Sequence, residues 1–183
     1  MERLSVALED AVEEPLSKVF SQLKFAPVLS LEKNKIWQWQ QTKRTTLVEF
    51  LTPSFEADEG IRDLPALGVS AQSLHHLDFL LSDPMQVPLV YRSGALVQIP
   101  QPERFAIHKL IVADRRSSDP SRLKARKDRA QADLLIEVLS EERPGEPAKA
   151  YEDAIGRGPV WRNRISASLN LMSQARKRID DIT

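Results

Sequence analysis

Two basic residues in the second half of the sequence have the spacing of side chains on one helical face. Lys109 follows Phe105 by four residues and precedes Val112 by three, so it lies on a mostly apolar stripe of the predicted helix. Arg116 continues along the same side. A lysine on such a stripe extends to solvent, forms an ion pair or points into a cavity. The helix that packs beside it therefore decides what Lys109 does.

A second predicted helix carries Lys127 in register with Leu123 and Leu134. If the two helices form a hairpin, the basic side chains of both converge on one pocket, where Asp128 and Asp133 orient them. Ammonium and guanidinium groups in a partly dry pocket bind phosphate groups well. The alternative is a structural network of ion pairs, and the spacing alone does not choose between the two.

Glu49 is a third kind of candidate, because it is an acidic residue within a predicted strand. It lies between Val48 and Phe50, where a carboxylate is disfavoured by strand propensity. A strand carboxylate that faces a cleft is suited to bind Mg²⁺. The alternative is an exposed strand face on which Glu49 pairs with Lys43 or Arg44.

Other chemistries find little support in the sequence. The 183-residue chain has no cysteine, which excludes disulfides and thiolate zinc sites. His75 and His76 are adjacent and point in different directions on a helix. Glu56 and Asp58 have the spacing of a metal-binding pair, but they lie in a highly charged segment and are interpreted as surface residues. A glycine-rich phosphate loop is also missing from the sequence.

The charges are balanced overall but unevenly distributed. The chain has 26 basic and 26 acidic residues, whereas residues 103–129 contain nine Lys or Arg and four Asp or Glu. A local basic patch suits a phosphate-bearing ligand better than a long nucleic acid, although a solvated helix surface is the alternative. The acidic N-terminal stretch differs from a signal peptide, and long apolar runs are missing. We therefore expect a cytoplasmic protein with no membrane contact.

The elements that position these residues follow from hydrophobic spacing and from turn residues. Short alternating stretches predict strands at 26–31, 36–41, 45–51, 87–91 and 95–99. A loop is expected at 54–69 and a helix at 73–81. Helical spacing predicts further helices at 3–24, 103–116, 121–139, 147–155 and 159–179. The fold class is therefore α+β, with a small mixed or antiparallel sheet in residues 1–100 and a helical bundle in residues 101–183.

Several stretches resemble a bacterial nucleotidyltransferase-fold family of the DNA polymerase beta superfamily. The most specific is PQPERFAIHKL at 100–110, and VEFLTP at 48–53 is similar to a strand of that family. KDRAQADLL at 127–135 and GRGPVW at 156–161 continue the resemblance in order. The likeness covers most of the chain, and it implies an α/β nucleotidyltransferase portion in residues 1–100, incomplete as it stands, followed by a helical lobe.

The resemblance implies transfer of a nucleotide monophosphate from an NTP to a hydroxyl or amine of a protein, an RNA or a small molecule. It also implies Mg²⁺, held by three carboxylates around two metal ions. Glu49 matches the third of these carboxylates, in a catalytic and metal-binding role. Lys109 and Lys127 match the helical lysines of the family, and we expect them to neutralise the substrate phosphates. Arg116 and Asp128 are expected in the same substrate-binding site, where Asp128 orients the cations.

The sequence departs from the family in the residues that precede Glu49. Its first glycine is Gly60, and no aspartate lies between Asp10 and Asp58, so the Gly-Ser turn and the Asp-x-Asp pair are missing. We expect the strand that carries this motif to lie upstream of residue 1. The chain would then be part of a longer protein, or a shortened homologue that has lost the motif and with it catalysis. Whether the chain is an enzyme depends on that motif.

Two expectations follow from the missing motif. The 183 residues alone should bind Mg²⁺ weakly and transfer no nucleotide, and the alternative function is a non-catalytic module that binds nucleotide, RNA or protein. A missing strand would also leave an open sheet edge or an uncovered apolar face, with Trp37 and Trp39 there, and we therefore expect self-association into a homo-oligomer.

Overall fold

The computed structural model describes residues 15–32, 35–90, 94–118 and 120–183, and the statements below concern these ranges. The chain divides into two compact units, residues 1–78 and 79–183. The sequence placed the division at residue 100, whereas the compact units divide after Asp78. The limits of the functional domains stay a prediction. Each unit is described by itself.

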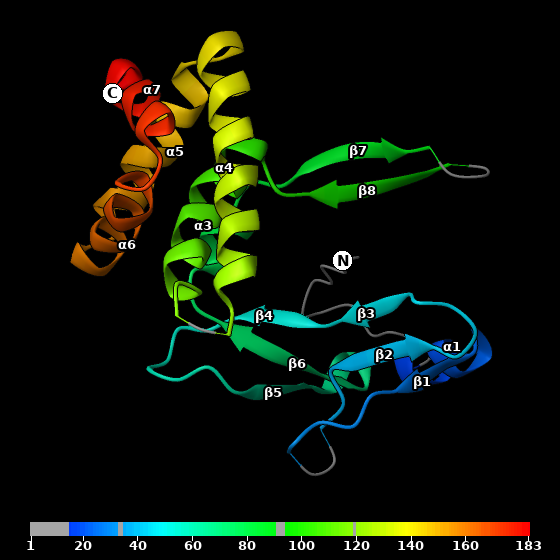
Figure 1. The fold of residues 1–183 in the computed structure, drawn as a ribbon. Helices are drawn as coiled ribbons and strands as arrows, with labels where there is room; N and C mark the ends of the chain where they lie inside the picture. The colour runs from blue at the N-terminus through cyan, green and yellow to red at the C-terminus, as the bar shows by residue number, and fades with distance from the viewer. Residues whose placement is uncertain (1–14, 33–34, 91–93, 119) are drawn as a thin grey trace. The chain divides into compact units, whose positions relative to one another are not determined.

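The first unit begins with an antiparallel sheet that follows a short helix. Helix α1 (Leu16–Gln22) leads into β1 (Phe25–Pro27), β2 (Gln38–Gln41) and β3 (Leu47–Glu49), in the order β1-β2-β3 (Figure 1). The pairing of Gln40 with Leu47 places residues 42–44 in the connection between β2 and β3. The strand predicted at 36–41 corresponds to β2, and the strand predicted at 45–51 is confirmed as far as Glu49, where β3 ends.

A second sheet of the first unit contains strands that the sequence did not reveal. It has the order β4-β6-β5, formed by β4 (Leu51–Pro53), β6 (Val69–Leu74) and β5 (Ile61–Leu64), and β4 is parallel to β6. The predicted loop at 54–69 is therefore wrong, because β5 and the 3₁₀ turn η1 (Pro65–Leu67) occupy part of it. The predicted helix at 73–81 starts later, as α2 (Leu77–Leu81).

The small side chains of β6 explain why these strands escaped detection. Ala71 and Ser73 are almost fully buried, yet neither contributes the large apolar side chain that makes a strand recognisable. Pro65 and Gly68 lie in the connection between β5 and β6, and proline and glycine favour the prediction of a loop. The strands form because burial between neighbours compensates for weak intrinsic propensity.

The core of the first unit lies on one face of the β1-β2-β3 sheet. It consists of large apolar side chains with smaller ones around them: Trp39, Val48, Phe50, Leu67, Val69 and Ala71. Phe20 of α1 stacks on Trp39 with ring centroids 5.3 Å apart. Trp39 is 4% exposed, so the expectation that it lies on an uncovered face is wrong. Self-association itself stays a prediction.

The second unit combines a hairpin with five helices in its described part. The hairpin pairs β7 (Met85–Leu89) with β8 (Ala95–Ile99). The helices are α3 (Pro102–Arg115), α4 (Arg122–Glu142), α5 (Gly145–Gly156), α6 (Pro159–Leu169) and α7 (Ser173–Ile182). The sequence predicted one helix over 159–179, but Met172 has an extended backbone, with φ −138° and ψ 72°, and separates α6 from α7.

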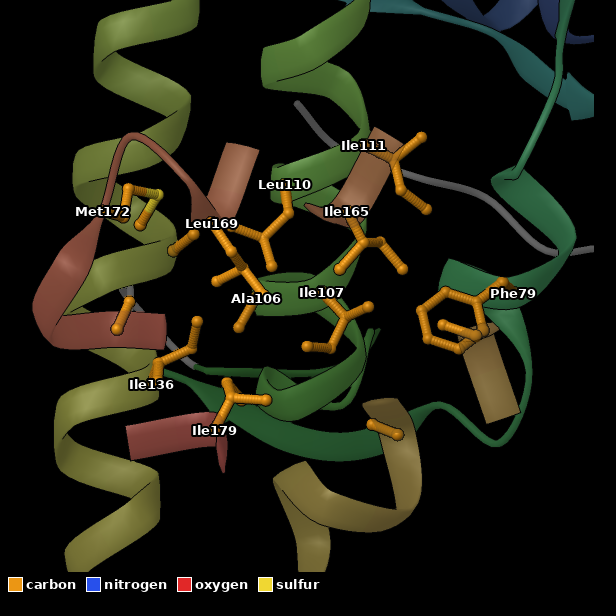
Figure 2. Close-up of a cluster of buried hydrophobic side chains, with 14 residues drawn as sticks. Phe79, Ala106, Ile107, Leu110, Ile111, Ile136, Ile165, Leu169, Met172 and Ile179 are labelled. Atoms are coloured by element: carbon orange, nitrogen blue, oxygen red, sulfur yellow. The ribbon is translucent and has the colours of Figure 1, made fainter. Parts of the chain in front are cut away.

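Helix α3 lies at the centre of the core of the second unit. Its residues Ala106, Ile107, Leu110 and Ile111 are fully buried and recur at helical spacing (Figure 2). They pack against side chains from the other helices and from α2, among them Phe79, Ile136, Ile165, Leu169, Met172 and Ile179. The predicted α+β class, with small sheets followed by helices, is confirmed. Among the described helices, none has the length and apolar character needed to cross a membrane.

Replacement of Ile107 tests the central position of α3. Ile107 is 0% exposed, so Ile107→Ala should lower the free energy of unfolding by about 2–5 kcal/mol through lost burial and a residual cavity. Leu123→Ala is the control, because this side chain of α4 is 77% exposed and its loss should change stability by less than about 0.5 kcal/mol. Urea unfolding followed by circular dichroism measures both. Equal effects of the two replacements would contradict the described core.

Candidate functional site

A buried carboxylate on α4 joins two of the predicted basic residues on α3. Lys109 Nζ lies 2.7 Å from Asp128 Oδ1, and Arg116 Nη1 lies 2.7 Å from Asp128 Oδ2. The side chain of Asp128 is 3% exposed, and both of its oxygens accept a hydrogen bond from a cation. Of the five residues expected to converge, Lys109, Lys127, Arg116, Asp128 and Asp133, the structure brings together Lys109, Arg116 and Asp128. We call them the Asp128 cluster.

The helical repeat explains how the Asp128 cluster forms. Lys109 and Arg116, the residue that follows α3, are seven residues apart, which is close to two helical turns, so both side chains lie on the same side as seen along the helix. Lys109 Nζ also lies 5.1 Å from the centroid of the Phe105 ring, one turn earlier, in a cation–π contact. Asp128 lies on the helix that packs against this side of α3. The sequence thus positions a carboxylate opposite two cations.

The cations of the cluster differ in their access to solvent. The side chain of Lys109 is 18% exposed, whereas that of Arg116 is 43% exposed. Two cations facing one carboxylate leave a net positive charge. The guanidinium of Arg116 has donors beyond the one that Asp128 uses, because it carries five N–H groups. The cluster can therefore bind an anion that reaches Arg116 from solvent.

Lys127 and Asp133 lie outside the Asp128 cluster. Lys127 is exposed, and within the described ranges it makes no hydrogen bond to Asp128. Consecutive helical residues point about 100° apart, so Lys127 and Asp128 cannot share one direction. Asp133 Oδ1 is buried without a hydrogen-bond partner. The predicted role of Lys127 in phosphate binding stays a prediction.

Glu49 is the last residue of β3 and is half-buried. Its Oε1 accepts a hydrogen bond of 2.6 Å from Gln38 Nε2, and Gln38 is its partner in the β2–β3 register. Val48 and Phe50 are buried, so the alternation of the strand directs Glu49 to the other face of the sheet. Within the described residues, no group of three or more His, Cys, Asp or Glu side chains is placed to hold a metal ion.

A second charged cluster was not predicted from the sequence. Arg104 Nη1 lies 2.8 Å from Asp153 Oδ2, and Arg157 Nε lies 3.1 Å from Asp153 Oδ1. Both guanidinium groups stack over Phe79, at 4.8 and 5.2 Å, and Arg157 also stacks over Trp161. Only the spacing of Asp153 and Arg157, four residues apart, was visible in the sequence. Arg104 is 49 residues away from Asp153, and no local pattern reveals that pairing.

The arginines determine the protonation of Asp153. Burial alone would raise the pKa of its carboxyl group, but hydrogen bonds from Arg104 and Arg157 and their positive charges hold the pKa below the ordinary value of 3.8. Both arginines therefore stabilise the ionised carboxylate. This cluster ties α3, α5 and the start of α6 together.

The remaining charged candidates have structural partners. Arg62 pairs with Glu56 at 2.6 Å and with Asp58 at 3.3 Å, on the surface of the first unit, which is the interpretation made from the sequence. His75 lies between the carboxylate of Glu59 and the carbonyl of Glu56, at 3.1 and 2.8 Å. These contacts tie the segment after β4 to the end of β6.

A model of a family described as nucleotidyltransferase matches residues 1–156. The chain belongs to this nucleotidyltransferase family. No curated protein and no solved structure matches the chain.

The matched residues 1–156, called the family region below, contain both candidate sites and end within the helical unit. Glu49 and the Asp128 cluster lie inside residues 1–156, as does Lys127. Helices α3, α4 and α5 are therefore part of the family region, whereas α6 and α7 follow it. The resemblance that the sequence suggested is confirmed at the level of the family.

Removal of the central carboxylate tests the Asp128 cluster. Asp128→Ala leaves Lys109 and Arg116 without their shared partner, and we expect a loss of about 1–3 kcal/mol in the free energy of unfolding. Asp181→Ala, at an exposed position of α7, is the control and should change stability by less than about 0.5 kcal/mol. Thermal and urea unfolding provide the measurement. Equal stability of the two variants would show that Asp128 holds neither cation.

The Asp153 cluster predicts a dependence of stability on pH. The folded pKa of Asp153 lies below its ordinary value of 3.8, so the unfolded chain binds more protons in acid. The contribution to stability is thus complete above about pH 5 and is lost as the pH falls through the folded pKa. Unfolding measured from pH 6 to pH 2.5 should show a shallower decrease for Asp153→Asn than for the unmodified chain. Asp181→Asn should match the unmodified chain, and an unchanged slope in Asp153→Asn would contradict the prediction.

Proposed function

We propose that this chain binds an NTP with Mg²⁺ and acts in the transfer of a nucleotide monophosphate to an acceptor hydroxyl or amine. The observation that carries the proposal is the family match, which covers residues 1–156. Transfer requires the Asp-x-Asp carboxylates that these 183 residues do not supply upstream of Glu49. We therefore assign nucleotide binding to the chain by itself, and transfer to it only together with that motif.

Glu49 is assigned as one carboxylate ligand of the metal. Within the described residues, the only hydrogen bond of its side chain is the one from Gln38, which fixes Oε1 and leaves Oε2 for a cation. Mg²⁺ prefers oxygen ligands, and proteins often hold it through one or two carboxylates together with substrate phosphates and water. Glu49 fits that donor set only in part. We therefore expect Mg²⁺ to bind appreciably only together with the nucleotide.

The Asp128 cluster is assigned to the phosphates of the nucleotide. Its net positive charge supports this role, as does the exposure of Arg116, whose free N–H groups can contact phosphate oxygens. Asp128 acts as a positioning residue, because it fixes Lys109 and Arg116 on one side of α3. When bound, the metal ion would neutralise charge on the phosphates and stabilise the entering and leaving oxygens.

A non-catalytic nucleotide-binding module is the second candidate function. The observation that favours it is that the described residues contain no group of three potential metal ligands. In such a module the phosphates would be held by Lys109 and Arg116 without a metal. The two candidates therefore differ in their requirement for Mg²⁺, and one titration separates them.

Titration with ATP, with and without Mg²⁺, tests the proposal. Isothermal calorimetry should show binding that is strengthened by Mg²⁺. The double variant Lys109→Ala/Arg116→Ala should lose about tenfold or more in affinity, because charged hydrogen bonds contribute about 1.5–3 kcal/mol each. Lys177→Ala is the control, since this exposed lysine of α7 lies beyond the family region. Glu49→Gln should reduce the effect of Mg²⁺ and leave metal-free binding unchanged.

The possible outcomes separate the candidate functions. Binding that needs the two cations of α3 but is indifferent to Mg²⁺ would identify the non-catalytic module. Binding that is unaffected by the double variant would contradict the phosphate role of the Asp128 cluster. Incubation with α-labelled ATP and Mg²⁺ should leave the 183-residue chain and added acceptors unlabelled, and efficient labelling would show that the Asp-x-Asp pair is dispensable.

A further inference from the structure

The outer face of α4 carries apolar side chains that the helical unit leaves exposed. Leu123, Leu134 and Val138 are 77%, 60% and 40% exposed, and Ala130 between them is exposed as well. Intervals of four and seven residues place these four side chains on one side of the helix, away from the buried side that contains Ile136. We call the four residues the outer stripe. A single exposed leucine is ordinary, but a continuous stripe indicates a contact surface.

The charges of α4 are separated along its length. Residues 122–129 contain five Lys or Arg and one Asp, whereas residues 130–142 contain four Asp or Glu and no basic residue. The one carboxylate of the first half, Asp128, is buried and already binds Lys109 and Arg116. Cations at the start of a helix and carboxylates at its end both oppose the helix dipole, so this distribution destabilises an isolated helix. A neighbouring helix with the opposite direction would compensate for it.

The charged residues along one edge of the outer stripe have a regular spacing. Arg122 and Arg126 are four residues apart, as are Asp133 and Glu137, and the helical repeat places all four on the same side of the stripe. In a parallel pair of α4 helices each cation would face its own copy. In an antiparallel pair Arg122 faces Glu137, and Arg126 faces Asp133. Charge complementarity therefore identifies an antiparallel second copy of α4 as the partner that fits this face.

We propose that this chain forms a homodimer in which α4 packs antiparallel against α4 of a second copy, about a two-fold axis near Arg129. The same register places Leu123 of each copy against Leu134 of the other, because a two-fold axis repeats every contact. Ala130 and Lys127 meet near the axis, where the small alanine leaves room for the apolar stem of the lysine. Burial of the outer stripe stabilises the dimer, and the charges determine its orientation.

The proposed interface is separate from the Asp128 cluster. Asp128 faces α3, where it binds Lys109 and Arg116, whereas the outer stripe lies on another side of α4. Self-association is measured without nucleotide, so its failure and the failure of the proposed function are observed separately. A single pair of helices buries less surface than a standard protein–protein interface. We therefore expect a dimer of micromolar affinity and monomers in dilute solution.

Cross-linking through single cysteines tests the orientation of the two helices. The chain contains no cysteine, so Ala130→Cys introduces a unique thiol beside the two-fold axis. A short bismaleimide should join most of these chains into dimers at high micromolar concentration. Glu142→Cys is the matched control, because this exposed position of α4 lies at opposite ends of an antiparallel pair and should not be cross-linked. Efficient cross-linking at position 142, or none at position 130, would overturn the proposal.

An exchange of charges tests the register. Arg122→Glu places like charges opposite each other in both symmetry-related contacts, so sedimentation velocity should show a dimer that is weakened about tenfold or more. The double variant Arg122→Glu/Glu137→Arg restores opposite charges and should recover the dimer. A double variant that associates no better than the single variant would show that these two residues do not meet.

Removal of the apolar contact provides a second measurement. Leu134→Glu should abolish the dimer, because it places a carboxylate against Leu123 of the second copy. Circular dichroism of this variant should match that of the unmodified chain, since the side chain of Leu134 is 60% exposed in a single copy. An unmodified chain that sediments as a monomer at high micromolar concentration, or a Leu134→Glu variant that still forms dimers, would contradict the proposed interface.

Discussion

Burial of one side of α3 constrains the rest of the helical unit. Ile107, Leu110 and Ile111 are fully buried, so the polar side chains of this helix can leave it only on the remaining side. Lys109 and Arg116 do so, toward α4. A lysine that is held against a packed helix without a partner would lose hydration with no compensation. The carboxylate of Asp128 provides that compensation, and its position is therefore coupled to the packing of the core.

The two charged clusters of the unit have opposite arrangements. In the Asp128 cluster the carboxylate is the most buried member, and one cation reaches solvent. In the Asp153 cluster the carboxylate is the most exposed member, and both arginines stack on the ring of Phe79. Stacked guanidinium groups have little freedom to turn toward a ligand, whereas Arg116 retains it. This contrast is the physical reason for assigning phosphate binding to one cluster and stabilisation to the other.

Sequence reasoning succeeded where the determining interactions are local. The prolines that begin α3 and α6, the helical repeat of Lys109 and Arg116, and the turn between β2 and β3 all act over a few residues. It failed where distant segments decide the structure. The parallel pairing of β4 with β6 joins residues about 20 apart, and the small buried side chains of β6 give no apolar alternation. The pairing of Arg104 with Asp153 likewise depends on how α3 and α5 pack.

The β2–β3 pair relates the two faces of the first unit to each other. Gln38 holds Glu49 on one face, and Trp39, the next residue, packs into the core of the first unit on the other. The strand backbone between them is short and hydrogen-bonded to β1 and β3, so it behaves as one rigid element. The hydrogen bond that orients the Glu49 carboxylate and the packing of Trp39 in the core therefore depend on the same short strand.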